Sequence, residues 1–563
     1  MAKSRYLSPA VLSGILSAIF GLILVGPRNT WFTNVDWLTS KRITQDPRTA
    51  QVVWEFFRKS PILQWPINRV PNYADGAETV FQSGIGLNLL GVPFKLVEFI
   101  LPTDFQYYGF WIILCFFLQG YFGARLIGIW SKNKLEVFFA SLLFVISPIF
   151  IHRIGIMGQY DLGAHWLLLA ALFLYFDKKF SVFRWTALLL ISLWISVYVV
   201  LMVIAIAVTA AMKEILIGGI KARNLLLQAL PPVALFVFSF FMLGYNEYGG
   251  NAVGTGFFRL NLASFIYPKV AYGSVNFQPS SLIVEQFDFI MSRPFVAFED
   301  EGYNFLGISS LILLFPLCYF VFRNRSAIDL RRHVPILLTS IILLLIAASN
   351  KIVFIRREIM VPIPSEIAEL RQVFRSATRF AWPLTYLLVL YGVIALLKST
   401  RVFWKIVIVF TFVLLQFVDS SKLVNETYRH FHDEEHVVLL ETEYWNSIGK
   451  GIEAVRLVPT FDLISDGKSK DAEEWLIDGR WFSLIEFASR QGTKINFGYV
   501  ARPTPEYVER TNRSVSLAVE SGVFEHRAMY VFATPELWRQ AIKTMPSYGR
   551  SQILDGFFLI ITE

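Results

Sequence analysis

The segment WFTNVDWLTSKRITQDPRTAQVVWEFFRKSPILQWPINRVPNYADGAE, residues 31–78, divides the first apolar run of the chain from all the later ones. It is rich in Trp, Arg, Asp and Pro, whereas the runs around it are suited to a lipid environment. A polar connection of this length between hydrophobic segments is more often functional than a plain connector. The segment therefore predicts a long loop between membrane spans, and it is the first place to look for chemistry.

The composition is typical of a polytopic membrane protein. Of the 563 residues, 55% are hydrophobic and 17% are charged, and the mean hydropathy is +0.50. Soluble domains carry about 25% charged residues, and the repeated apolar runs of this chain have membrane-spanning length. The formal net charge of +9 is expected from cytoplasmic loops beside anionic headgroups, and no nucleic-acid-binding signature accompanies it.

The cysteines and the N-terminus are both consistent with a polytopic membrane protein. Cys115 and Cys318 both lie in apolar runs, so they predict no disulfide, no metal cluster and no thiol catalysis. The first apolar run, from Ala10 to Val25, is not followed by a small-residue cleavage site. We therefore interpret it as a retained first span and not as a signal peptide.

Basic residues in short loops mark the cytoplasmic side of a membrane, and this rule sets the predicted spans. The chain must leave and return between successive basic clusters, such as Lys132/Lys134 and Arg331/Arg332. The expected fold is a polytopic α-helical membrane protein with about eleven spans, the N-terminus inside and the C-terminal tail outside. The predicted spans lie near residues 9–26, 106–129, 136–151, 161–176, 184–197, 198–212, 224–245, 303–322, 334–350, 380–397 and 402–418.

Two segments leave the path of the chain open. A crossing at 81–101 would put Lys132/Lys134 outside, so we interpret 81–101 as a re-entrant or interfacial segment. Residues 184–212 are short for two crossings, and a tight hairpin with its apex near Ser196 would allow both. If 184–212 is one tilted helix instead, 81–101 must supply the missing crossing.

Residues 1–419 thus form the predicted membrane module, with 27–80 as its first outer loop, and 420–563 form a second domain. Apolar runs beginning near Val455, Thr493, Met529 and Gly556 alternate with helical stretches. This alternation predicts a small extracytoplasmic α/β domain with a largely parallel sheet. The domain has no GxGxxG or P-loop glycines, so a nucleotide site is not expected.

The first outer loop contains the acidic residues Asp36, Asp46, Asp75 and Glu78. Asp46 followed by Pro47 is a helix-start pattern, with the aspartate at the N-cap and the proline at the first helical position. A structural cap is one interpretation. The other is that a rigid, ionised carboxylate at the membrane surface accepts a proton from a sugar hydroxyl.

A second group of candidates lies in HRIGIMGQYDLGAHW, residues 152–166. Arg153, Asp161 and His165 fall at or inside the outer membrane boundary, and the last two are four residues apart, as on one helix face. Ionisable groups at this depth usually face a polar cavity. The alternatives are a buried pair that only joins helices, and a divalent-cation site for which two ligands are too few.

A third group lies in ELRQVFRSATRFAWP, residues 369–383, where Arg371, Arg375 and Arg379 recur every four residues. One interfacial arginine is explained by snorkelling to headgroups. Three on one outer face go against the positive-inside bias, and guanidinium forks suit a phosphate or pyrophosphate. In FEDEGYNFLG, residues 298–307, Glu301 beside Tyr303 is the acid that we expect to point inward.

These strings resemble a known class of enzyme. QDPRTAQVVWEFFR, FQYYGFWIILCFFLQG, GAHWLLLAALFLYF, EGYNFLG and FRSATRFAWP are similar to strings of bacterial members of the GT-C superfamily of integral-membrane glycosyltransferases, related to O-antigen-modifying transferases of lipopolysaccharide. The resemblance covers residues 9–418 and includes the long first outer loop. It implies a GT-C-like fold and inverting transfer of a sugar from a polyprenyl-phosphate donor to a glycan or lipid acceptor of the cell envelope.

The resemblance implies a role for Asp46, and the residue patterns described above supply the other candidates. Asp46 matches the catalytic carboxylate of the first loop, and Arg371, Arg375, Arg379 and Arg153 are the expected ligands of the donor phosphate. Asp161, His165 and Tyr303 are expected at the acceptor or in the cavity, with Asp36, Asp75, Glu78 and Glu301 as acidic partners. The string VFQSGIGL departs from the pattern, because Gln82 and Ser83 stand where an acidic residue is expected.

The implied location is the bacterial inner membrane, with the active site and the C-terminal domain on the periplasmic side. No cofactor is required by the sequence, and a divalent cation is left open. The alternative function is a flippase or transporter of a lipid-linked sugar, which predicts interrupted spans and internal repeats. A scaffold that displays the C-terminal domain is the third class.

Overall fold

The computed structural model divides the chain into two compact units, and each is described by itself. Unit 1 consists of residues 1–34, 104–238 and 255–433, and unit 2 of residues 35–103, 239–254 and 434–563. The structure describes residues 8–39, 45–76, 86–247, 260–272, 276–287, 300–324, 328–355, 357–362, 364, 376–399, 402–432, 440, 443–459, 479–498 and 505–563.

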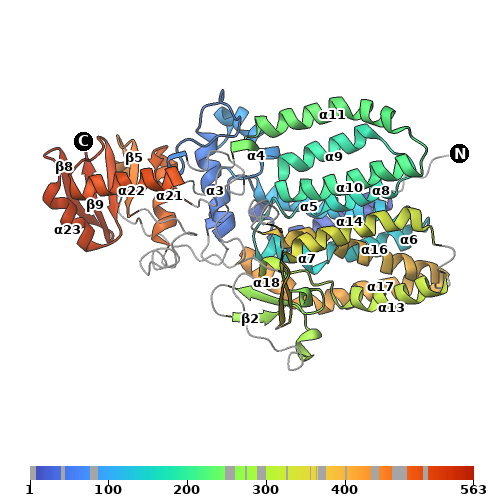
Figure 1. The fold of residues 1–563 in the computed structure, drawn as a ribbon. Helices are drawn as coiled ribbons and strands as arrows, with labels where there is room; N and C mark the ends of the chain where they lie inside the picture. Colours follow the sequence, from blue (N-terminus) through green and yellow to red (C-terminus); the bar gives the residue numbers. More distant parts are fainter. Residues whose placement is uncertain are drawn as a thin grey trace. The chain divides into compact units, whose positions relative to one another are not determined.

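Unit 1 is a bundle of apolar helices (Figure 1). Its α-helices are α1 (Pro9–Val25), α5 (Tyr108–Ile127), α6 (Lys134–Val145), α7 (Pro148–Ile151), α8 (Trp166–Phe176), α9 (Val182–Ile195), α10 (Val197–Leu216), α11 (Ala222–Met242, which extends into unit 2), α13 (Ile308–Arg323), α14 (Leu330–Ala348), α16 (Trp382–Ser399), α17 (Val402–Asp419) and α18 (Ser421–His432). A π-helical turn, η5 (His152–Ile156), continues α7, and the 3₁₀ turns are η1 (Arg28–Thr30), η7 (Leu262–Phe265), η8 (Val284–Phe287), η9 (Asp300–Gly302) and η10 (Ala377–Ala381).

Among the described residues, fewer helices qualify as membrane spans by length and apolarity than the eleven that the sequence predicts. Five qualify, and the number rises to seven if two bent pairs each count as one span. The five are Tyr108–Ile127, Val197–Leu216, Ala222–Met242, Leu330–Ala348 and Ala377–Ser399, and the bent pairs are Lys134–Val145 with Pro148–Ile156 and Trp404–Asp419 with Ser421–His432. The remaining apolar helices, α1, α8, α9 and α13, are shorter than 18 residues. A membrane protein with five to seven candidate spans is therefore the supported description.

The helix break at Ser196 lies where the sequence suggests a hairpin apex. Ser196 has φ −154° and ψ 131°, so it ends α9 and precedes α10 in an extended conformation. α9 and α10 pack against each other. Segment 81–101 contains only one described α-helix, α4 (Asn88–Leu96), in unit 2. At 1.5 Å per residue its nine residues extend for roughly 14 Å, which is too short to cross a bilayer.

Small residues bring α1 and α5 close together. A Cβ atom at Gly14 would lie 2.8 Å from the Phe117 ring, and one at Gly120 would lie 2.6 Å from the Ser13 carbonyl oxygen. Ser13 Oγ also bonds to Ser141 Oγ of α6 at 2.7 Å. Helices that bury small residues approach each other closely and gain van der Waals contact, which is a common basis of helix association in membranes.

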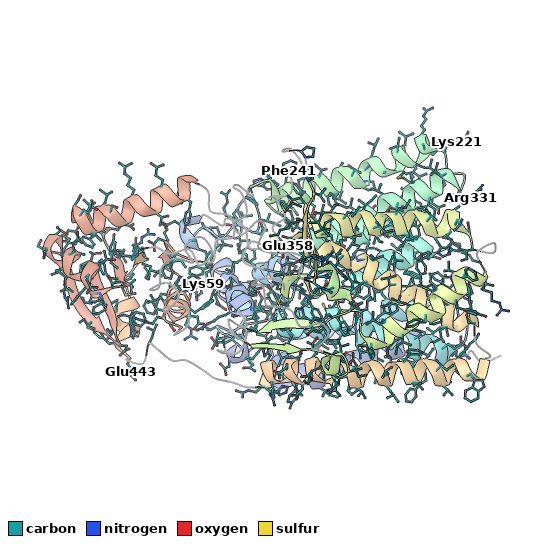
Figure 2. All side chains as sticks on the ribbon, turned by 60° about the horizontal axis from the view of Figure 1, so that its bottom comes forward. Lys59, Lys221, Phe241, Arg331, Glu358 and Glu443 are labelled. Carbon is teal, nitrogen blue, oxygen red and sulfur yellow. The ribbon has the colours of Figure 1, made fainter. Side chains whose placement is uncertain are left out.

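Three labelled residues mark the two ends of unit 1. Lys221 and Arg331 lie at one end of the bundle and Glu358 lies at the other (Figure 2). Glu358 belongs to the hairpin of β3 (Lys351–Phe354) and β4 (Arg357–Met360), and a second hairpin pairs β1 (Lys269–Tyr272) with β2 (Asn276–Pro279). Both basic residues belong to clusters that the sequence predicts on the cytoplasmic side.

Unit 2 combines short helices with a five-stranded sheet (Figure 1). Its helices are α2 (Asp36–Thr39), α3 (Gln45–Arg58), η2 (Ala74–Gly76), α4 (Asn88–Leu96), η4 (Glu98–Ile100), η6 (Tyr245–Glu247), α19 (Tyr444–Gly449), α21 (Arg480–Gln491), α22 (Pro505–Glu520) and α23 (Pro535–Thr544). Its strands are β5 (Ala454–Val458), β6 (Lys494–Ile495), β7 (Ala528–Phe532), β8 (Gly549–Leu554) and β9 (Phe557–Thr562).

The sheet is mixed, with the strand order β6-β5-β7-β9-β8. β5 pairs in parallel with β6 and β7, whereas β9 is antiparallel to both β7 and β8. The prediction of a largely parallel sheet therefore holds only for its first half. The reason is Asp555-Gly556, a two-residue connection between β8 and β9 with φ of 46° and 80°, because a connection this short joins only antiparallel strands.

Most of the predicted first outer loop, from residue 35 onward, belongs to the same unit as the C-terminal sheet. Arg48 of α3 donates to Glu486 of α21 at 2.9 Å, and its guanidinium lies 4.6 Å from the centre of the Phe482 ring. Asn72 accepts a backbone hydrogen bond from Ile495 of β6 at 3.0 Å. Residues more than 400 positions apart in the chain therefore stabilise one another here.

Candidate functional site

The polar centre of unit 1 forms around Arg153, which the π-helical turn η5 carries. This side chain is 1% exposed. Its Nη1 donates to Gln159 Oε1 at 2.5 Å and to Glu301 Oε2 at 2.7 Å, and its Nη2 donates to the Glu301 carbonyl oxygen at 3.2 Å. π-Helical turns inside α-helices occur frequently at functional sites, because the extra residue redirects side chains.

Arg379 reaches the same carboxylate from η10. Its Nη2 donates to Glu301 Oε1 at 3.0 Å and to Oε2 at 3.1 Å, and its Nε lies 3.3 Å from Oε2. Gln159 joins both arginines, because its Oε1 also accepts from Arg379 Nη2 at 3.2 Å while its Nε2 donates to Glu301 at 2.8 Å. We call Arg153, Gln159, Glu301 and Arg379 the arginine cluster.

Charges within the arginine cluster control the ionisation of Glu301. Burial alone would raise the pKa of this carboxyl, but the charges of Arg379 and Arg153 outweigh burial and hold its pKa well below the usual range. Glu301 is therefore ionised at every physiological pH. It remains a single carboxylate that hydrogen-bonds to two guanidinium groups, and charge-assisted bonds of this kind are about twice as strong as neutral ones.

Asp161 lies in the turn before α8, close enough to Arg379 and Arg153 to interact with both charges. Burial raises its pKa to about 6, although the Arg379 charge and hydrogen bonds from Leu162 and Ser196 oppose the rise. Its Oδ1 atom is buried and has no hydrogen-bond partner within the described part of the chain. This oxygen is available to accept a hydrogen bond from a ligand.

His165 and the arginine cluster both contact the ring of Trp382. Its ring lies 4.3 Å from Trp382, and the Arg153 guanidinium lies 5.1 Å from that Trp382 ring. His165 Nδ1 is 2.7 Å from Tyr386 Oη, which also accepts from Gln119 Nε2 at 3.1 Å. His165 Nε2 and Trp382 Nε1 have no hydrogen-bond partner among the described residues.

The predicted helical pairing of Asp161 with His165 is wrong in its local geometry. Residues 161–165 form turns, and α8 begins only at Trp166 with His165 as its N-cap. The two side chains therefore do not share a helix face. Within the residues that the structure describes, no three His, Cys, Asp or Glu side chains gather as a metal site.

Tyr303 and His152 lie beside the arginine cluster. Their rings are stacked with centres 4.2 Å apart, and Tyr303 Oη is 2.7 Å from Ser280 Oγ. Burial raises the pKa of Tyr303 well above its usual value, so its hydroxyl stays protonated. Both ring nitrogens of His152 are buried with no hydrogen-bond partner in the described ranges.

Of Arg371, Arg375 and Arg379, the structure describes only the last. Arg371 and Arg375 lie outside the described residues. Arg379 itself lies in a 3₁₀ turn, in which side chains three residues apart are aligned and a spacing of four is not.

In unit 2, Asp46 lies in the first turn of α3, which begins one residue before it at Gln45. Asp46 is therefore the second helical residue, and the predicted N-cap lies two positions later in the chain than the start of α3 requires. Asp75 bonds to Arg456 of β5 at 2.5 Å, and Arg456 also bonds to Glu525 at 2.9 Å.

Of the two remaining acidic candidates in the first loop, the structure describes one. Asp36 is exposed at the start of α2. Glu78 lies outside the described ranges.

Sequence reasoning missed Gln159, His152, Trp382 and Tyr386. Gln159 is the one residue of these with a readable signal, because it is a polar side chain within the string IGIMGQYD. The others resemble ordinary aromatic and polar residues of apolar helices. His152 and Trp382 are distinguished only by ring nitrogens without a hydrogen-bond partner among the described residues, and Tyr386 only by its contact with His165.

Two protein-family models match the sequence, one in its membrane part and one in its C-terminal part. The model described as Domain of unknown function (DUF6311) matches residues 14–421, and the DUF6311 C-terminal domain matches residues 444–562. No curated protein and no solved structure matches the chain.

Proposed function

The chain belongs to the DUF6311 family, and we propose that it is a membrane glycosyltransferase that uses a polyprenyl-phosphate sugar. The sugar passes to a glycan or lipid acceptor of the cell envelope. The main support for the proposal is the arginine cluster, together with nearby buried polar atoms that have no hydrogen-bond partner among the described residues. The clustering supports a site that receives an anion together with a ligand rich in hydroxyl groups.

Two arginines held by a single carboxylate support the phosphate part of the proposal. Arg379 bonds to Glu301 and Gln159 through Nε and Nη2, and its Nη1 has no hydrogen bond to the described residues. Guanidinium groups bind phosphate oxygens bidentately. In the proposed role Arg379, with Arg153 beside it, binds the donor phosphate and stabilises the phosphate that departs.

The unmatched atoms beside the cluster support the sugar part. Asp161 Oδ1 accepts hydrogen bonds, Trp382 Nε1 donates them, and His165 Nε2 can do either, depending on its tautomer. Buried polar atoms in folded proteins are nearly always paired, so a group of unpaired ones calls for a ligand or water. Sugar hydroxyls donate and accept, and they would pair with all three.

Asp46 is the proposed general base. The acceptor oxygen attacks the anomeric carbon, and its proton passes to the Asp46 carboxylate. The bond between that carbon and the phosphate oxygen breaks, the electron pair leaves with polyprenyl phosphate, and the anomeric configuration inverts. Stabilisation of the departing charge is commonly the largest single contribution to such a reaction.

The proposed topology has eleven crossings in a bacterial inner membrane, with chemistry on the periplasmic side. Each of the eleven predicted segments coincides with an apolar helix or bent pair, and the proposal counts the four shorter helices as the crossings beyond seven. The break at Ser196 supports separate crossings by α9 and α10. Cysteine accessibility in spheroplasts, compared at Lys221 and Glu358, tests the orientation.

The test of function is turnover by the purified full-length protein in detergent. A radiolabelled polyprenyl-phosphate hexose is the donor, and release of polyprenyl phosphate is measured with envelope glycolipid as acceptor. Asp46→Asn is expected to lower turnover by roughly 100- to 10,000-fold, because a general base contributes about that factor. Glu536→Gln, at an exposed acidic residue in the first turn of α23, is the matched control and is expected to retain turnover. Transport that needs sealed vesicles, without any sugar transfer, would favour the flippase instead.

A further inference from the structure

We infer that two short loops of unit 2, residues 61–65 and 96–100, insert together into the lipid surface as a membrane anchor. This inference is independent of glycosyl transfer. We call the two loops the apolar tips. Their partner is a lipid bilayer and not a second protein.

The apolar tips expose large hydrophobic side chains that have no core to enter. Leu63 is 95% exposed, Phe99 is 81% exposed and Ile100 is 68% exposed. Exposed apolar patches of this kind mark interaction sites with proteins or membranes. The remaining members of the patch are Ile62, Trp65, Leu96 and Val97.

Polar contacts at the base of the loops hold the two tips side by side. The buried Lys95 donates from Nζ to Ser60 Oγ at 2.6 Å and to the Pro61 carbonyl oxygen at 2.9 Å. Arg58 donates to the carbonyl oxygens of Pro102 and Thr103, each at 2.8 Å. The backbone at the base is therefore satisfied by protein, while the apolar side chains point away from it.

The end of a membrane-spanning helix adjoins the tips, and this favours lipid as the partner. The backbone N–H of Ile67, two residues after Trp65, donates to the carbonyl oxygen of Met242 at 3.1 Å. Met242 is the last residue of α11, a helix of 21 residues that is long and apolar enough to span a membrane. The tips therefore adjoin the level at which α11 leaves the hydrocarbon.

The surface of α11 continues the same apolar exposure. Leu230, Phe238 and Phe241 are 62%, 56% and 46% exposed, and Phe241 lies at the end of the helix (Figure 2). Trp side chains are enriched at the membrane–water interface, which is the depth expected for Trp65 and the tips.

Spin-label accessibility in vesicles tests the anchor. In full-length protein with Cys115→Ala and Cys318→Ser, single cysteines replace Leu63 or Phe99 and carry a nitroxide. The protein is reconstituted into phosphatidylcholine–phosphatidylglycerol vesicles. Power saturation then compares collisions with oxygen, which enters lipid, and with nickel–EDDA, which stays in water.

Two exposed positions serve as matched controls. Leu226→Cys lies on the exposed face of α11 at 67% exposure, and Val523→Cys lies in the C-terminal sheet domain at 58% exposure. We expect the oxygen-to-nickel ratio at Leu63 and Phe99 to exceed that at Val523 severalfold and to approach that at Leu226.

Either of two results overturns the anchor. A ratio equal to that at Val523 would mean that the tips face water. Protection from both reagents would mean that protein covers the tips. Because both labelled side chains are exposed, the substitutions leave the folded core intact.

Discussion

Arg153 and Glu301 are 148 positions apart in the chain, yet Nη1 of one lies 2.7 Å from Oε2 of the other, and both side chains are buried. The pair joins the π-helical turn after α7 to the 3₁₀ turn η9. Arg379 shares the same carboxylate, so the loss of this one group leaves two buried cations without their counter-charge.

Glu301→Gln is expected to lower the free energy of unfolding by about 3–5 kcal/mol, the range found when one partner of a buried ion pair is removed. Thermal unfolding of the detergent-solubilised protein measures the change. Glu358→Gln is the control, because the Lys351–Glu358 pair is half-exposed and is expected to contribute no more than about 1 kcal/mol. Equal effects of the two substitutions would contradict the central role of Glu301.

Asp161 is expected to make the folded protein less stable as pH rises. Its pKa is about 6 in the folded state and lies above the ordinary value of 3.8, so the folded state binds the proton more tightly than the unfolded state. The stabilisation is complete below about pH 4 and is lost as pH rises through 6. Because Asp161 is only partly buried, the loss is expected to be about 1–2 kcal/mol.

The pH dependence of Asp161→Asn checks this assignment. The difference in free energy of unfolding between wild type and variant should change between pH 4 and pH 7. The groups that face Asp161, which are Arg153, Arg379, Leu162 and Ser196, are the same in both proteins. A parallel pair of stability curves over this range would assign the titration to another group.

Gly120→Ala is expected to destabilise the contact between α1 and α5 by about 1–3 kcal/mol, because its Cβ would overlap Ser17 and meet the Ser13 carbonyl oxygen. Gly123→Ala, one turn later, would meet chiefly the movable Phe144 ring at 3.1 Å and should cost less. Melting temperatures of the two variants in the same detergent give the comparison. A larger loss at Gly123 would show that α1 is not the limiting neighbour.

Asp75→Asn and Asp46→Asn are expected to differ in kind. Asp75 is ion-paired with Arg456, so its neutralisation should lower stability while turnover per folded molecule is retained. Asp46→Asn should lower turnover by roughly 100- to 10,000-fold and leave the melting temperature nearly unchanged. Parallel assays of turnover and unfolding separate the two, and loss of turnover at Asp75 with normal stability would exchange their roles.

The sequence by itself determined the secondary structure well. The helix that follows Asp46-Pro47, the apolar helices and the alternation of the C-terminal domain all appear near their predicted positions, because capping and hydrophobic periodicity act over a few residues. The strand β8 was missed because its burial is slight, although the Asp555-Gly556 turn before β9 is a recognised hairpin signal.

Only the tertiary structure decided which charged residues act together. Nothing in the sequence near Arg153, Glu301 or Arg379 predicts that these residues contact one another. The sequence also does not distinguish Asp75 from Asp46 as a candidate base, whereas the structure pairs Asp75 with Arg456. Contacts between distant segments depend on how helices and strands pack, and no spacing within a short window encodes them. The physical reason is that periodicity reports which face of an element is buried, whereas the identity of its neighbour is set by the whole fold.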